Sequence, residues 1–469
     1  MYFHTWPFVL FFLLFYPTYL ALKRTRFRLP LLLGASYFFY AWAKPSYLIV
    51  ILYLFLILYV SLVDYLMVVL MSVTRWRKLC LSVSIINGLS LLVIFKYGTF
   101  VTDNINVLLS SLSIPYIIPA PGIFLPVGLS FYIFQSMSYT IDYYRGNIER
   151  EKSFIRYATF VSLFPRLLAG PIERAKNLLP QLHKTPRVSI EDIADGLSLF
   201  VVGFFKKVAL ADYLALYVNN VYAAPEQSQS PALMLATFLF AWQIYFDFSG
   251  YTDMARGIAR MMGLRLMLNF NNPYLATGLG DFWSRWHISL SSWFRDYVYI
   301  PLGGNRRGKF NTYRNILLTM VISGLWHAGL FESPSWTFVI WAVVHALGYW
   351  LTRELERTSF YRDKVPKLAK QLFVFGFVTF AWIFFRAESI TDAWVIITRI
   401  FTSGFADPRC PLLALTFVFT VWLYQFAYES RVKWFLEARA VRIGIVVLMV
   451  LYLAIFAPSS EQPFIYLQF

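Results

Sequence analysis

The sequence predicts an all-α protein that crosses a membrane several times. Hydrophobic residues fill 58% of its 469 positions, aromatic residues 20% and charged residues only 14%, and the mean hydropathy is +0.56. Soluble domains carry roughly 25% charged residues. The length allows roughly ten to fourteen spans of about 20 residues each with their loops. We therefore expect one integral membrane domain over residues 1–469, without a separate soluble domain.

Ten apolar runs are the more regular candidates for spanning helices. Most approach the ~20 residues that a helix needs to cross about 30 Å of hydrocarbon. They are residues 7–22, 47–73, 79–95, 126–144, 233–248, 315–331, 336–351, 372–385, 412–428 and 443–457. The first run has no basic segment before it and no small-residue cleavage site after it, so we expect a retained helix rather than a signal peptide.

Three stretches between these runs are less regular. Residues 29–42 are short for a span, residues 154–182 are interrupted by prolines and a glycine, and residues 263–307 are semi-polar. Interrupted helices persist at membrane depth only when they pack in protein or line a cavity. These stretches predict re-entrant or interfacial helices around a central site.

The charge pattern predicts membrane orientation rather than nucleic-acid binding. The net charge is +17, but Lys and Arg occur in short clusters between apolar runs, at 23–28, 75–78, 145–152, 295–314, 353–370 and 431–442. Because basic loops stay on the cytoplasmic side, we place these loops in the cytoplasm and both termini on the opposite, periplasmic side. Cys80 and Cys410 match no metal or redox spacing, which excludes a disulfide framework.

Residues 281–296 form an aromatic stripe. Trp283, Trp286, Leu290 and Trp293 recur at helical spacing, with His287 at the edge of the stripe. Two interpretations have equal weight here. The stripe is typical of an interfacial helix anchored by its tryptophans, and it would also suit a helix that presents His287 to a substrate.

A cationic turn follows at residues 299–310, YIPLGGNRRGKF. It approaches the spacing of a phosphate-binding loop, but Phe310 stands where Ser or Thr is required and no strand precedes it, so we reject nucleotide hydrolysis. Arg295, Asn305 and Arg306 are candidates for contacts with an anionic donor such as a coenzyme. Membrane orientation and contacts with lipid headgroups explain each single arginine equally simply.

His327 lies about thirteen residues into the apolar run 315–331. In a helix, that places its imidazole roughly 20 Å from the basic entry at Arg314, deep in the bilayer. An ionisable group at that depth is costly and indicates function, although a core histidine bonded to a carbonyl would also fit. His327 and His345 could approach each other, but no cysteine or carboxylate spacing supports a metal site, and none is expected.

Several motifs along the chain resemble those of a known protein family. The segments WSRWHISLSSWFRDYVYIPLGGNR at 283–306 and GLWH at 324–327 resemble the signature of membrane-bound O-acyltransferases, in their bacterial alginate O-acetyltransferase branch. Further similar segments are 35–42, 126–132, 164–171, 245–251, 382–386 and 463–469. The first thirty or so residues and the loop 223–230 match less clearly.

The resemblance implies a ring of transmembrane helices around a thinned centre, with the catalytic region at about 245–350. It assigns His327 to the essential histidine of the family, and His287 to a second active-site position where members carry His, Asn or Asp. It also implies acetyl transfer from a cytoplasmic thioester, acetyl-CoA, with no bound cofactor. The acceptor would be an extracytoplasmic polysaccharide, reached directly or through an SGNH-type acetyltransferase partner. The membrane would be the bacterial inner membrane.

The chemistry of the residues agrees with this expectation. Burial disfavours the charged imidazolium, so a deep His327 would be a neutral base that accepts the hydroxyl proton during attack on the thioester. A covalent acyl-imidazole at His327 is the alternative. His287, Trp326 or backbone amides could polarise the thioester carbonyl. Together with these, Trp286 and the turn residues named above are the expected substrate contacts.

Three buried acids receive lower weight. Asp64, Asp142 and Asp247 lie in or beside apolar runs, where we expect structural pairing, with arginines as the candidate partners. Asp247 is the best of the three for shaping the site. Gln135, Asn269 and Asn271 are candidates for capping broken helices.

Two functions from other classes compete with an acyltransferase. A transporter or channel would explain the spans and the broken helices but not the two histidines that flank a cationic turn. A scaffold that anchors a secreted enzyme would carry no chemistry of its own. Acetylation of peptidoglycan or cellulose by the same chemistry is a further alternative for the acceptor.

Overall fold

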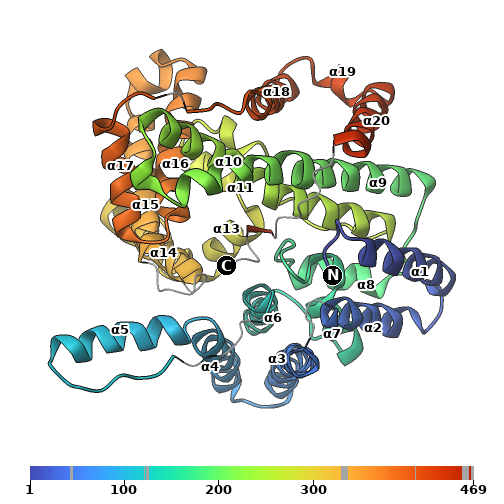
Figure 1. Cartoon of the computed structure of the whole chain (residues 1–469). Coiled ribbons are helices and arrows are strands. Elements are labelled where there is room, and N and C mark those ends of the chain that lie inside the picture. The colour runs from blue at the N-terminus through green and yellow to red at the C-terminus, as the bar shows by residue number, and fades with distance from the viewer. Residues whose placement is uncertain are drawn as a thin grey trace. The chain divides into compact units, whose positions relative to one another are not determined.

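All regular elements in the described part of the chain are helical (Figure 1). The structure is a computed structural model that describes residues 1–42, 46–120, 122, 126–328, 336–406, 408–456 and 464–465. It contains two compact units. The first comprises residues 1–105, 113–204 and 251–267, and the second comprises residues 106–112, 205–250 and 268–469. The chain therefore passes between the units several times, and helix α11 contributes to both.

Each of the ten apolar runs coincides with a helix, which confirms their prediction as helices. The helices are α1 (Trp6–Leu22), α3 (Tyr47–Val73), α4 (Arg77–Phe95), α6 (Leu129–Tyr144), α11 (Ser230–Met261), α14 (Gly308–Ala328), α15 (Thr337–Arg357), α16 (Lys367–Arg386), α18 (Leu412–Tyr428) and α20 (Arg439–Phe456). The expected ends of two runs, at residues 331 and 457, lie outside the described residues.

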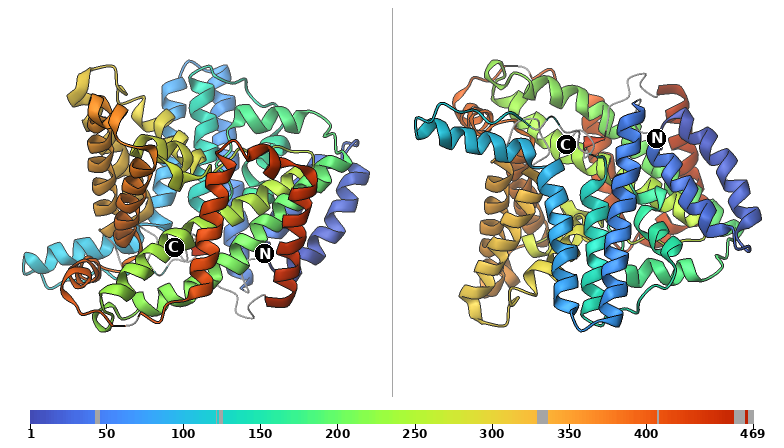
Figure 2. Two further views of the ribbon diagram at one scale, coloured as in Figure 1. Left: turned by 90° about the horizontal axis from the view of Figure 1, so that it is seen from above. Right: turned by 90° about the horizontal axis from the view of Figure 1, so that it is seen from below.

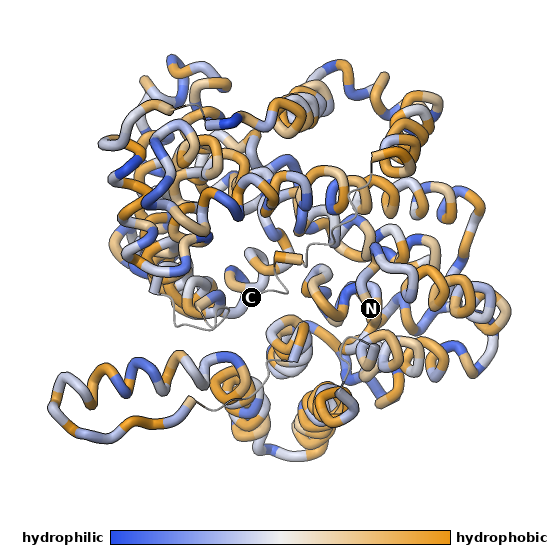
Figure 3. Tube along the Cα trace, viewed as in Figure 1, coloured by the Kyte–Doolittle hydropathy of each residue, from blue (hydrophilic) through white to orange (hydrophobic). Residues whose placement is uncertain are grey.

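Five of the described helices are long and apolar enough to cross a membrane: α3, α4, α11, α16 and α20. Two shorter apolar helices, α1 and α18, add to them. The hydropathy along these helices is visible in Figure 3. Helix α14 is not one of the five, because it begins at Gly308 and its first two turns are polar. His327 is the penultimate residue of the described helix rather than its midpoint.

In the first unit, α3, α4 and α6 lie side by side (Figure 2). A buried carboxylate joins them. Asp64 on α3 accepts hydrogen bonds from Ser84 Oγ of α4 at 2.6 Å and from Ser136 Oγ of α6 at 2.5 Å. The expectation of an arginine partner for Asp64 was wrong. Neutral hydroxyls satisfy the acid there without burying a second charge.

The irregular stretch 154–182 is broken, as predicted. It contains α7 (Phe154–Ser162), the 3₁₀ turn η1 (Phe164–Arg166) and most of α8 (Ala175–His183). The short run 29–42 forms α2 (Arg28–Ala41). The remaining helices that lie wholly or mostly in this unit are α5 (Gly98–Ser111) and α9 (Ile190–Phe205).

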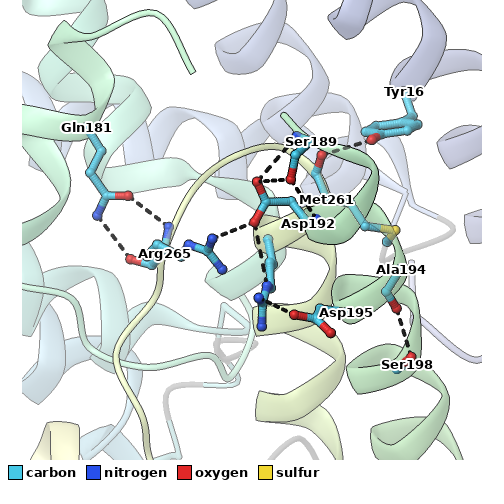
Figure 4. A network of polar contacts seen from close by, with 10 residues as sticks. Tyr16, Gln181, Ser189, Asp192, Ala194, Asp195, Ser198, Met261 and Arg265 are labelled. Carbon is cyan, nitrogen blue, oxygen red and sulfur yellow. Dashed lines mark hydrogen bonds and ion pairs between the residues drawn. The ribbon is translucent and has the colours of Figure 1, made fainter. Parts of the chain in front are cut away.

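A polar network pins the segment after α11 to its neighbours in the first unit (Figure 4). The backbone N–H of Arg265 donates to Gln181 Oε1 of α8 at 2.8 Å, and the Arg265 carbonyl accepts from Gln181 Nε2 at 3.0 Å. The Arg265 guanidinium also donates to Asp192 in the first turn of α9 at 2.5 Å. The network therefore fixes the segment after α11 against α8 and α9.

The second unit contains the candidate site. Its α14, α15 and α16 pack in sequence against one another (Figure 1). The semi-polar stretch forms short elements there, namely η4 (Pro273–Leu275), α12 (Leu279–Arg285), α13 (Ile288–Phe294) and the π-helical turn η5 (Arg295–Tyr299). The remaining elements are η2 (Lys206–Ala211), α10 (Asp212–Tyr222), η3 (Pro225–Gln227), η6 (Phe360–Lys364), α17 (Ile390–Thr402) and α19 (Lys433–Glu437).

Candidate active site

The backbone turns sharply at His287, between α12 and α13. His287 has φ 44° and ψ 53°, in the left-handed region. The prediction of one continuous helical stripe over residues 281–296 was therefore wrong. A non-glycine residue held in this conformation costs of order 1–3 kcal/mol and is found disproportionately at functional sites. Trp286 and His287 therefore form a corner between the end of α12 at Arg285 and the start of α13 at Ile288.

Asn269 explains why the helix breaks at this point. The Asn269 carbonyl accepts from the Ile288 N–H at 2.9 Å. Its side-chain oxygen accepts from the Ser289 N–H at 3.2 Å and from Ser289 Oγ at 2.9 Å. These bonds satisfy N–H groups that the first turn of α13 leaves without intrahelical partners. Asn269 thus caps α13 from a distant loop, which confirms its predicted capping role.

Gly324 brings α14 close to α15 one turn before His327. A Cβ atom at Gly324 would lie 2.5 Å from the Phe338 carbonyl oxygen and 2.7 Å from Ala342 Cβ. Small residues permit such close helix crossings in membrane proteins. The crossing places the His327 ring 5.5 Å from the Trp341 ring, between centroids, in an edge-to-face arrangement.

His327 and His287 line the same cavity, although they come from different elements of the second unit. The cavity has a volume of about 90 Å³. Its walls come from α12 and α13, the Trp286–His287 corner between them, α14, α15 and α16. Only 3% of His327 and 1% of His287 is exposed. Two imidazoles therefore face a small cavity whose other walls are largely aromatic.

The surroundings of His287 are apolar. Its ring centroid lies 4.7 Å from that of Phe248 and 6.4 Å from that of Phe270. Burial lowers the pKa of His287 from 6.5 to about 3, because the charged form loses its hydration. His287 is therefore neutral at physiological pH. A neutral imidazole carries one N–H donor and one acceptor nitrogen.

The lowered pKa of His287 predicts an acid-sensitive fold. Between pH 6.5 and about 3 the unfolded chain binds a proton at this residue that the folded chain does not bind. Its contribution is unchanged above pH 6.5 and destabilises the fold progressively below it, by about 2 kcal/mol at pH 5. We expect His287→Asn, which cannot titrate, to lose less thermal stability between pH 7.5 and pH 5 than the wild type. Equal losses in detergent-purified wild type and variant would contradict this assignment.

Of the other predicted site residues, only Trp286 reaches the cavity wall. Arg295, Asn305 and Arg306 are exposed, and none of them lines the cavity. Arg295 donates instead to its neighbour Asp296 at 2.9 Å. Trp326 is 5% exposed, and its ring centroid lies 4.7 Å from that of His327, but it does not line the cavity.

Asp247 belongs to a buried ionic cluster that does not line the cavity. Lys207 Nζ lies 2.6 Å from Asp247 Oδ1 and 2.8 Å from Asp212 Oδ1. The other carboxylate oxygen of Asp247 accepts from the Ile465 N–H at 2.7 Å. A lysine, not the expected arginine, is thus the partner of Asp247. Its neighbour Phe248 is the residue that contacts His287.

Sequence reasoning missed several residues that line the cavity, among them Thr319, Met320 and Ser323 of α14. Trp341 comes from α15, and Trp382 and Phe385 come from α16. The ring centroids of Trp286 and Trp382 lie 5.0 Å apart, and those of His327 and Phe385 lie 5.3 Å apart. A signal for α16 was available in the segment 382–386, which carries the family resemblance. Nothing local indicates that Trp341 faces the cavity.

The helices and the cavity define the class of the protein. It is a membrane protein with several spanning helices, and its two buried histidines at one small cavity suit acyl transfer. Residues 36–391 of the chain match the family described as MBOAT, the membrane-bound O-acyltransferases. The chain therefore belongs to this family and is a multi-pass membrane protein and an O-acyltransferase. This membership confirms the predicted family and the predicted enzyme class, and it does not favour a transporter or an inert scaffold.

Several relatives match most of the chain. It is 40% identical over 404 residues to the probable alginate O-acetylase AlgI of Azotobacter vinelandii, covering 84% of this chain and 77% of the relative. The protein of the same name from Pseudomonas aeruginosa is 39% identical over 84% of this chain and 74% of its own length. The peptidoglycan O-acetyltransferase of Helicobacter pylori is 33% identical over 77% of this chain and 72% of its own length.

Proposed function

We propose that this O-acyltransferase transfers acetyl groups from acetyl-CoA to hydroxyls of an extracytoplasmic polysaccharide, alginate or a related exopolysaccharide. The observation that carries the proposal is the presence of His287 and His327 at one small cavity. The names of the relatives at about 40% identity support the choice of an acetyl group and of alginate. The relative at 33% identity makes peptidoglycan the second candidate acceptor.

The size of the cavity favours a short acyl group. Its volume of about 90 Å³ is well below the roughly 300–1,000 Å³ of pockets that hold drug-sized ligands. An acetyl thioester centre fits in such a volume, whereas a fatty acyl chain would need far more room. The apolar walls suit the methyl group, and the two imidazoles supply the polar contacts that the carbonyl and the hydroxyl require.

In the proposed reaction, His327 is the general base. Its neutral imidazole accepts the proton of the acceptor hydroxyl while the oxygen attacks the thioester carbonyl carbon. The C–O bond forms, the C–S bond breaks, and coenzyme A leaves as the thiol after it takes up the proton. His287 is the group we assign to the developing oxyanion, because it lines the cavity and Trp326 does not. An acyl-imidazole at His327 remains the alternative path.

We further propose that the enzyme lies in the bacterial inner membrane, as a ring of helices around a thinned centre. The basic loops would face the cytoplasm, where the donor is made, and both termini would face the periplasm. The acetyl group would reach the acceptor directly or through an SGNH-type acetyltransferase partner on the periplasmic side. The exposed residues Arg295, Asn305 and Arg306 would meet the anionic donor outside the cavity.

The test uses purified protein in liposomes that contain radiolabelled acetyl-CoA, with alginate oligosaccharide outside. We expect label to reach the oligosaccharide only when protein, donor and acceptor are all present. Peptidoglycan fragments serve as the second acceptor, and addition of a periplasmic SGNH-type protein tests the need for a partner. The proposed donor is wrong if coenzyme A release from acetyl-CoA does not depend on the protein.

A series of donors tests the cavity argument separately. With labelled acetyl-CoA and octanoyl-CoA at equal concentrations, we expect transfer of the octanoyl group to be at least tenfold slower because its chain does not fit. Equal rates for the two donors would show that the acyl group does not occupy this cavity during transfer. The family assignment would be unaffected by that result.

A further inference from the structure

The turn between α3 and α4 forms a cationic pocket on the surface of the first unit. Arg75, Arg77 and Lys78 line it together with Trp76, Leu79 and Tyr144. The pocket has a volume of about 520 Å³, and all three basic residues are exposed. We name it the α3–α4 pocket. It does not include any residue of the candidate active site.

The positive charge of this pocket is not balanced within the described residues. Arg75 and Lys78 form no hydrogen bond or ion pair with any described residue, and Arg77 meets no described carboxylate. Three cations held within four positions repel one another. A bound anion would offset that repulsion, and phosphate is the anion that lysine and arginine together bind most readily.

The side chain of Arg77, which lines the pocket, is held in place by contacts with α6. Its guanidinium donates to the Tyr144 carbonyl of α6 at 3.2 Å. It also lies 5.9 Å from the ring centroid of Tyr143 and 5.7 Å from that of Tyr144, distances typical of cation–π contacts. The side chain is therefore held against α6 before any ligand arrives, which reduces the entropy that binding would cost.

The pocket lies where two membrane-spanning helices end. Helix α3 has 27 residues with a hydropathy of 2.4, helix α4 has 19 residues with a hydropathy of 2.0, and both qualify as spans. The turn between them must then lie at the level of the lipid headgroups. Trp76 is 63% exposed there, as is typical of tryptophans at a membrane interface.

We propose that the α3–α4 pocket binds the phosphate of an anionic glycerophospholipid, such as phosphatidylglycerol. The position at the end of two lipid-facing helices favours a lipid over a soluble phosphate compound. The same cations could in principle bind the phosphates of coenzyme A, so the experiment must separate these two sources.

The test is native mass spectrometry of the full-length protein from nanodiscs that contain phosphatidylglycerol and phosphatidylcholine. The variant is Arg75→Gln with Lys78→Gln, because these two side chains have no described partners and Arg77 stays to pack against α6. We expect the wild type to retain phosphatidylglycerol preferentially, and the double variant to bind it about tenfold or more weakly. A variant that binds as tightly as the wild type overturns the proposal.

The matched control is Arg24→Gln with Arg26→Gln in the basic loop between α1 and α2. It removes the same charge from a neighbouring loop that does not line the pocket. This control should retain the lipid. Equal losses in both double variants would mean that general surface charge attracts the lipid, and would overturn a specific pocket. Displacement of the lipid by micromolar coenzyme A, but not by inorganic phosphate, would overturn the choice of a lipid. Unfolding temperatures confirm that each variant is folded.

Discussion

Replacement of His327 by alanine is expected to lower the rate of acyl transfer by a factor of about 10² to 10⁴, the usual contribution of a general base. The imidazole lines the cavity near the described end of α14, and it is the group assigned to remove the hydroxyl proton. Alanine retains the helix but removes this base. The rate is measured with labelled acetyl-CoA at saturating donor, together with the unfolding temperature of the variant.

The control for this prediction is His345→Phe. His345 is also fully buried, and its ring lies 4.9 Å from that of Trp341 between centroids, but it does not line the cavity. Its replacement should leave most of the activity. If both variants lose activity equally, the reaction requires aromatic packing around the cavity rather than a base at His327.

Two further measurements separate the paths open to His327. Recovery of the His327→Ala activity by added imidazole would favour the base. Accumulation of acetylated wild-type protein without acceptor would favour the acyl-imidazole path.

Replacement of Lys207 by methionine is expected to destabilise the protein by about 3–5 kcal/mol, as when one partner of a buried ion pair is removed. Lys207 is 1% exposed, and its amine contacts both Asp212 and Asp247. Methionine has a similar length but no charge, so two buried carboxylates would remain without their shared cation. Thermal unfolding in detergent measures the loss.

Lys206→Met is the matched control at the neighbouring position. Lys206 is half-buried, and its amine lies 5.7 Å from the ring centroid of Tyr245, so its replacement should cost far less. Adding Asp247→Asn to the Lys207→Met variant should recover part of the stability, because it removes one of the two unbalanced charges. If the Lys207→Met variant unfolds at the same temperature as the wild type, the cluster of Lys207, Asp212 and Asp247 does not stabilise the fold as we infer.

Local signals in the sequence predicted the helices well. Each apolar run coincides with a helix because the length and composition of a spanning segment are properties of one contiguous window. The broken stretch 154–182 was also predictable, since proline and glycine interrupt helices through their own backbone preferences. His327 was recognisable because an ionisable residue in an apolar run is rare enough to be noticed singly. His287 lies in the semi-polar stretch, and the family resemblance rather than the local pattern singled it out.

The parts that sequence could not predict depend on contacts between distant segments. The break at His287 is stabilised by Asn269, while the residues around the break keep helical spacing throughout. Trp341 and Trp382 reach the cavity only because Gly324 lets α14 and α15 cross closely and α16 packs against α15. The sequence marked Asn269 as a candidate cap and the segment 382–386 as similar to the family, but it did not show which helix Asn269 caps or that Trp341 faces the cavity.

The left-handed backbone at His287 limits which side chains this position accepts without strain. Asn, Asp and His are the non-glycine residues most enriched in that region of backbone space, and they are the residues that the family resemblance assigns to this position. Variation among them therefore preserves the corner between α12 and α13, whichever side chain is present. The restriction to three residue types that the resemblance implies would then reflect the geometry of the chain as well as chemistry, and it would not by itself identify an acid, a base or an oxyanion donor.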